Sequence, residues 1–263
     1  MSTLRLLELS VWYATIVLHA LLVWKMLRCR LAGNYPAIFS LLAMQLVRSA
    51  WLIQYIYTPE AYRANLNRYA LTILFTEPVL IAARAVSVIE IAGHVLAAYR
   101  GLRVLGGTAL LAGLAGSLLV SLLLHSSEFT FSNEPAFWLR VLYLTETTVY
   151  TALLVFLLLL ALFVLYHPAP IRRNLLAHGI GFSIYMISSA AAVWLRNQDA
   201  AQWTRVASTM RLVLSLTGLA AWVWLLSPKG EEETVSVHVP LSPETEQRVL
   251  ARLHALNSAL ERK

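Results

Sequence analysis

Residues 147–166 read TTVYTALLVFLLLLALFVLY, a run of 20 residues without a single charge. At a rise of 1.5 Å per residue, a helix of this length matches the hydrocarbon core of a bilayer, which is about 30 Å thick. The next four residues are His167-Pro168-Ala169-Pro170. Proline cannot continue a helix without losing a backbone hydrogen bond. The stretch therefore predicts a membrane-spanning helix that ends near residue 166 and, with the apolar residues before it, begins near residue 137.

The composition of the whole chain agrees with this assignment. Of the 263 residues, 59% are hydrophobic and 13% are charged, and the mean hydropathy is +0.65. Soluble domains average about 45–50% apolar and about 25% charged residues. Outside turns and basic loops, the apolar residues form seven segments long enough to span a membrane. These predicted spans are residues 6–24, 37–57, 69–99, 104–124, 137–166, 175–195 and 203–226.

We therefore expect an all-α, seven-transmembrane-helix bundle over residues 1–227 and a cytoplasmic tail over residues 228–263. Seven spans place the two termini on opposite sides of the bilayer. The basic residues that fall on one side are Lys25, Arg28, Arg30, Arg100, Arg103, Arg172, Arg173 and Lys229. The positive-inside rule then places the N-terminus outside and the C-terminus in the cytoplasm, in our prediction across the inner membrane of a bacterium. The net charge of +7 is explained by this asymmetry and does not indicate a nucleic-acid partner.

Four ionisable residues inside the predicted spans share one depth. Arg48, Glu77, Glu146 and Arg211 each lie eight or nine residues in from the predicted outer end of a different span. That spacing puts them roughly 12–14 Å below the outer boundary. A charge in mid-bilayer costs at least about 2.5–3.5 kcal/mol, so such groups pair with one another. We predict an interior ion-pair layer, and the sequence leaves open which acid meets which arginine.

Three further polar residues lie on the third predicted span. Arg84 shares a face with Glu77, seven residues away, but the axial gap of about 10 Å predicts no direct contact between them. Arg84 would then need another partner or a filled cavity. Glu90 and His94 are one turn apart and are expected to interact as a secondary polar pair.

These charges admit three interpretations. They can hold the helices in register; they can form an outward-facing site where arginines recognise a small anionic ligand; or the acids can serve as relay groups in a transporter or channel. We favour a non-enzymatic, receptor-like sensor or scaffold. Its predicted site comprises Arg48, Glu77, Arg84, Glu146 and Arg211. Transport is the alternative.

The sequence predicts no catalytic residue and no cofactor. Retinal requires a lysine within a span, and Lys25, Lys229 and Lys263 all lie outside the predicted spans. His19, His94 and His178 are weak candidates for a zinc site, which would make the protein an intramembrane hydrolase. No His-xxx-His or His-Glu-xx-His pair supports the hydrolase interpretation.

The cytoplasmic tail contains one more predicted helix. Ser242-Pro243 is typical of a helix start, and an apolar stripe follows at spacings of four, three and four residues over residues 243–261. The stripe consists of Val249, Leu253, Leu256 and Leu260. A helix of about five turns is marginal alone, so it must dock. The expected partners are the lipid bilayer or the bundle itself, a second copy of the chain, or a cytoplasmic protein.

Overall fold

The computed structural model describes residues 3–56, 65–97, 99–124, 135–166, 171–198 and 200–235, together with isolated helical residues between 247 and 259. Its long helices are α1 (Thr3–Arg28), α3 (Pro36–Ile56), α5 (Leu66–Val95), α6 (Arg100–Leu124), α7 (Pro135–Tyr166), α8 (Arg173–Gln198) and α9 (Ala200–Leu225). The short elements are α2 (Leu31–Asn34), the 3-10 turn η2 (Pro228–Glu231), and the strands β1 (Ile171–Arg172) and β2 (Thr234–Val235).

The prediction of an all-α protein is confirmed, because a long helix occupies each apolar segment of the sequence. Among the described residues, four stretches are long and apolar enough to cross a bilayer: Leu9–Arg28, Pro36–Tyr55, Leu66–Val95 and Leu144–Tyr166. Shorter apolar helical stretches lie in α6 and α9, at Gly101–Gly116 and Val213–Leu225. The helix lengths and compositions are those of an integral membrane protein.

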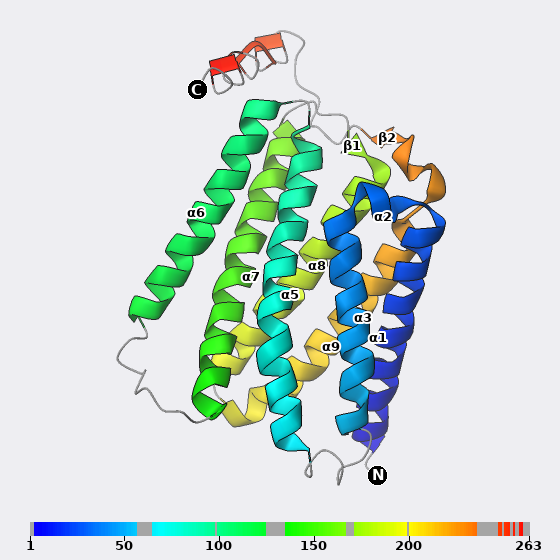
Figure 1. Ribbon diagram of the computed structural model, residues 1–263, viewed down its shortest axis with the longest axis vertical. Helices are drawn as coiled ribbons and strands as arrows, with labels where there is room; N and C mark the ends of the chain where they lie inside the picture. Colours follow the sequence, from blue (N-terminus) through cyan, green and yellow to red (C-terminus); the bar gives the residue numbers. More distant parts are fainter. Residues whose placement is uncertain are drawn as a thin grey trace.

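The long helices run side by side and alternate in direction (Figure 1). α8 packs along α9, and α1 lies against both α9 and α3. α5 packs on α3 and α7, whereas α6 stands at the periphery and rests mainly on α7. α5 therefore occupies the centre of the arrangement, and its polar side chains face several neighbours.

The distribution of side chains is inverted relative to a soluble protein. Large apolar side chains such as Trp224 and Phe75 are 82% and 74% exposed on the outside. Charged groups such as Glu77, Arg84 and Glu146 are buried inside. Apolar surface facing outward is favourable in lipid, where charges are costly unless they point into the bundle.

α1 is longer than the sequence indicated. It continues past residue 24 to Arg28, so Lys25 lies in its last turn and not outside the helix. The Lys25 Nζ donates a hydrogen bond of 2.6 Å to the carbonyl of Val223, near the end of α9. A cation is favourable against the free carbonyls at a helix C-terminus. The expectation that every lysine lies outside the spans is thus wrong for Lys25.

Residues 228–235, which we assigned to the tail, fold back onto the bundle. β2 pairs antiparallel with β1, with Ile171 opposite Val235. The buried Asn174 donates to the carbonyl of Ser227 at 2.9 Å and accepts from its amide at 3.0 Å. We call this region, residues 171–174 with residues 227–235, the inner clasp, since it lies at the end of the bundle that the basic loops share.

Salt bridges and a buried phenol complete the inner clasp. Arg172 pairs with Glu231 at 2.9 Å, and Arg173 pairs with Glu233 at 2.8 Å. Tyr35, between α2 and α3, is 1% exposed. Burial, and then the negative charge of Glu231, raise the pKa of Tyr35 above its usual value, so this phenol stays protonated at neutral pH. The clasp therefore ties the end of α9 to α8 and to the α2–α3 corner.

The predicted apolar stripe of the tail, Val249, Leu253, Leu256 and Leu260, lies outside the described residues. Neighbouring residues of that segment, including Arg248 and Arg252, are helical.

Candidate functional site

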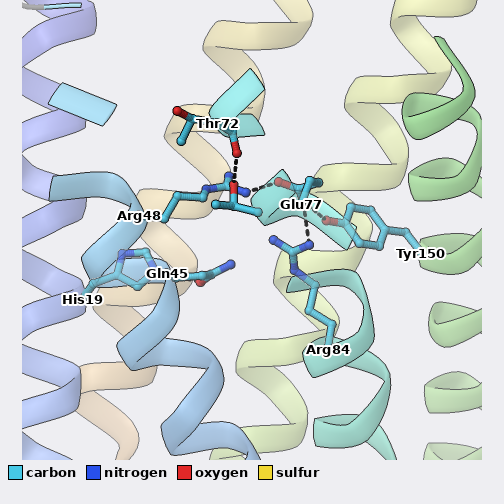
Figure 2. Close-up of polar contacts among 8 residues, drawn as sticks. His19, Gln45, Arg48, Thr72, Glu77, Arg84 and Tyr150 are labelled. Atoms are coloured by element: carbon cyan, nitrogen blue, oxygen red, sulfur yellow. Dashed lines mark hydrogen bonds and ion pairs between the residues drawn. The ribbon is translucent and has the colours of Figure 1, made fainter. Parts of the chain in front are cut away.

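A single carboxylate, that of Glu77, joins three helices (Figure 2). Glu77 lies in the middle of α5 and is 5% exposed. Its Oε2 pairs with Arg48 from α3, and its Oε1 accepts a hydrogen bond of 2.7 Å from Arg84. The hydroxyl of Tyr150, from α7, donates to the same Oε1 at 3.3 Å. Two cations and one phenol therefore converge on one anion, in an arrangement that we call the Glu77 cluster.

The contact between Arg84 and Glu77 corrects the prediction that their axial separation is too large. In a helix, side chains lean toward the N-terminus, so Arg84 points along α5 toward Glu77, two turns earlier. The arginine side chain is long enough to bridge the rest of the gap. A count of backbone rise alone leaves out both effects.

Arg84 is enclosed by aromatic rings as well. Its guanidinium carbon lies 5.1 Å from the ring centroid of Tyr150 and 5.5 Å from that of Tyr185, on α8. Arg84 is 1% exposed, and its Nε has no hydrogen-bond partner in the described part of the chain. Cation–π contacts are strongest where the cation is desolvated. Arg84 thus joins α5, α7 and α8.

Arg48 differs from Arg84 because it can be reached. Its side chain is 23% exposed, against 6% for that of Glu77. Gln45 lies one turn earlier on α3, near Arg48 (Figure 2), and its Oε1 is 3.1 Å from the Nε2 of His19. Arg48 and Arg84 share the carboxylate of Glu77. The accessible member of the Glu77 cluster is therefore a cation with polar neighbours.

The other two members of the predicted layer are placed less fully. Glu146 is 4% exposed and stands on α7 one turn before Tyr150, next to the Glu77 cluster. The backbone of Arg211 lies in α9, but its side chain is outside the described part of the structure. The structure therefore brings together Arg48, Glu77 and Arg84. That Glu146 and Arg211 complete the ion-pair layer stays a prediction.

Glu90 and His94 do not pair with each other as expected. The two carboxylate oxygens of Glu90 accept hydrogen bonds of 3.0 Å from the amides of Ala37 and Ile38. These amides belong to the first turn of α3, where backbone N–H groups lack helical partners. His94 Nε2 donates to the carbonyl of Asn34 at 3.0 Å. Glu90 and His94 therefore each bond to free backbone groups across the helix interface and not to each other.

The three histidines proposed as metal ligands have separate partners. His19 bonds to Gln45, and the buried Nδ1 of His178 accepts a hydrogen bond of 2.9 Å from the indole of Trp222. The ring of Tyr35 contacts those of both His94 and His178, with centroids 5.0 and 4.6 Å apart. In the described ranges, no group of three or more His, Cys, Asp or Glu side chains is placed to hold a metal ion.

Sequence reasoning missed Tyr185. The only signal in the sequence is the position of this tyrosine in the middle of a predicted span, since tyrosine is most frequent at membrane interfaces.

No known protein family, curated protein or solved structure matches this chain.

Proposed function

We propose that the protein is a non-enzymatic, receptor-like membrane protein whose Glu77 cluster binds a small anionic ligand. In this proposal α1, α3, α5, α6, α7, α8 and α9 all span the bilayer. The N-terminus lies outside and the C-terminus lies in the cytoplasm, as the positive-inside rule indicates. The Glu77 cluster then lies in the outer half of the membrane.

One observation carries this proposal: two arginines share Glu77, and only one of them is accessible. Arg84 is fixed by Glu77, Tyr150 and Tyr185. Arg48 is partly exposed and its guanidinium has more N–H donors than Glu77 uses. A ligand carboxylate or phosphate can accept the remaining donors of Arg48 in a charge-assisted, bidentate contact. These N–H donors favour an anion over a cation.

The arrangement of α3 and α5 suggests how binding could reach the cytoplasmic side. Among the described residues, polar contacts join these packed helices at two points: at Arg48–Glu77, and at Glu90 with the first turn of α3. The two meeting points are 13 residues apart on α5, or about 20 Å along the axis. A ligand that draws Arg48 away from Glu77 breaks the first of these two contacts between α3 and α5. The second contact, at Glu90, joins the same two helices at their other end.

The test is anion-dependent stabilisation of the purified protein in detergent. Acetate, succinate and inorganic phosphate are compared with chloride at constant ionic strength, and the unfolding temperature is measured. A ligand that binds only the folded state adds about 2.7 kcal/mol of stability at 100 times its Kd. We expect at least one of the polyatomic anions to stabilise the wild type above chloride. The effect should be lost in Arg48→Gln.

The matched control is Arg68→Gln, because Arg68 is an exposed arginine in the first turn of α5, outside the Glu77 cluster. It should respond to anions as the wild type does. Equal stabilisation of Arg48→Gln and wild type, or no stabilisation of the wild type by any of the three anions, would contradict the proposal.

Transport is the second candidate function, and Pro78 favours it. Pro78 follows Glu77 inside α5 and has no amide hydrogen to donate to the carbonyl of Leu74. Interrupted helices beside intramembrane acids occur along substrate and ion pathways. Flux of protons, chloride or succinate into reconstituted vesicles, abolished by Glu77→Gln, would favour transport. Absence of flux for all three, combined with anion-dependent stabilisation, favours a receptor.

A further inference from the structure

A second site lies on the opposite half of the molecule from the Glu77 cluster, between α5 and α6. There a groove of about 890 Å³ opens to the outside. It arises because α6 rests mainly on α7 and stands off from α5 (Figure 1). Its walls combine a polar end, on the side of the basic loops, with a long apolar portion. Such a lining is complementary to an amphiphile.

Arg103 provides the charge at the inner end of the groove. It is exposed in the first turn of α6, and among the described residues no hydrogen bond or ion pair engages its guanidinium. The groove also contains Glu90, whose two oxygens are already bonded to the amides of Ala37 and Ile38. The N-terminus of α3 offsets the charge of Glu90. Arg103 therefore remains the cation that an anionic partner would meet.

The apolar portion continues toward the middle of the membrane. It is lined by Val86 and Ile89 from α5, by Val104 and Leu111 from α6, and by Phe156 from α7. From Arg103 to Leu111 the groove follows eight residues of helix, or about 12 Å. Val104 and Leu111 are 64% and 57% exposed, so this wall faces lipid chains in a bilayer.

We propose that this groove binds an anionic phospholipid of the inner leaflet, with its phosphate on Arg103 and an acyl chain between α5 and α6. Charge complementarity identifies the occupant: an exposed arginine, unpaired within the described part of the chain, lies at the polar end of an apolar channel. Basic pockets between transmembrane helices on the cytoplasmic side bind such headgroups. A second copy of the chain would have to supply an acid to Arg103 as well as apolar side chains. The inference does not depend on the proposed ligand of the Glu77 cluster.

Gly107 offers a way to block the groove without disturbing the bundle. It lines the groove, and a Cβ at this position would meet no atom within 4 Å. A leucine there would project into the channel. Gly113, on the same helix, has equally open surroundings but does not line the groove, so Gly113→Leu is the matched steric control. Lys229→Gln is the control for Arg103→Gln, because Lys229 is an exposed cation at the same end of the bundle.

The experiment measures lipid retained by the full-length protein. Each variant is reconstituted in nanodiscs of phosphatidylglycerol and phosphatidylcholine in equal amounts, transferred to mild detergent and examined by native mass spectrometry. The wild type should retain phosphatidylglycerol in preference to phosphatidylcholine. Arg103→Gln should lower the ratio of the two about fivefold, the effect of one basic residue at an anionic membrane surface. Gly107→Leu should lose both lipids, and the two controls should behave as the wild type does.

Equal phosphatidylglycerol retention by Arg103→Gln and wild type would overturn the inference, as would unchanged retention by Gly107→Leu. A dimer mass that disappears in Gly107→Leu while lipid retention is unchanged would also overturn it, and would show that the groove joins two copies of the chain. Arg48→Gln should retain phosphatidylglycerol normally. This result would show that lipid retention does not depend on the Glu77 cluster. The lipid experiment therefore stays valid even if the Glu77 cluster binds no anion.

Discussion

At the scale of single residues, the stability of the bundle depends on the carboxylate of Glu77, whose removal would leave Arg84 buried without a counter-ion. Glu77 and Arg84 are 5% and 1% exposed, and each is the counter-ion of the other. Transferring either ion from water into a low-dielectric interior costs several kcal/mol, which the pair recovers only through its mutual contact. Breaking a buried pair from one side is therefore far more costly than exchanging both partners.

We predict that Glu77→Gln lowers the free energy of unfolding by about 3–5 kcal/mol, because it leaves Arg84 buried without a counter-ion. The measurement is reversible unfolding in mixed micelles titrated with SDS, followed by tryptophan fluorescence. Arg48→Gln is the comparison, since the side chain of Arg48 is partly exposed and its loss leaves the Arg84–Glu77 pair intact. Equal losses for the two variants would show that Arg84 is not the residue that depends on Glu77.

The sequence could predict part of this cluster. Counting inward from the span ends placed Arg48 and Glu77 at one depth, and the structure pairs them. The same count failed for Arg84, because it measured backbone rise and left out the length and direction of the side chain. The ring of Tyr185 on Arg84 could not be predicted, since it depends on how α8 is rotated against α5.

At the scale of elements, the start of α3 is capped by a different helix. Helices commonly cap themselves with a nearby Ser, Thr, Asp or Asn. Here Tyr35 and Pro36 precede the free amides of Ala37 and Ile38, and Glu90 of α5 accepts both. The negative charge also interacts favourably with the positive end of the α3 dipole. This contact fixes the N-terminal end of α3 against α5.

We predict that Glu90→Gln destabilises the protein by about 1 kcal/mol, the usual value of a charged helix cap. Hydrogen exchange should increase in the first turn of α3 while the amides of α7 stay protected. Glu232→Gln is the control, because the Glu232 side chain is exposed in the inner clasp. Unchanged exchange at Ala37 and Ile38 in Glu90→Gln would contradict the cap.

The helices themselves could be predicted closely from apolar length and turn residues, because those signals are local. The inner clasp could not, since β1 and β2 are about 60 residues apart in the chain and two residues long each. Such short strands carry no periodic signal of their own. Their pairing depends on α8 and α9 already lying side by side, which brings Asn174 next to Ser227.

At the scale of the whole molecule, the protein is an inside-out bundle with two separate polar regions. The Glu77 cluster occupies one half, while the inner clasp and the groove at Arg103 occupy the other. α5 runs through both and carries Glu77, Arg84 and Glu90 on its buried side. α3 also takes part in both, through Arg48 at one and the amides of Ala37 and Ile38 at the other.

The central claim is that Arg48 faces an anion site that is open to the outer side of the membrane. The most direct test uses the single native cysteine, Cys29, as an inner-side reporter. A Cys29→Ser, Arg48→Cys variant and the wild type are labelled in right-side-out and inside-out vesicles with a membrane-impermeant maleimide.

We predict that position 48 is labelled only in right-side-out vesicles and Cys29 only in inside-out vesicles. Labelling of position 48 from the inner side, or from neither side, would contradict an outward-facing site at the Glu77 cluster.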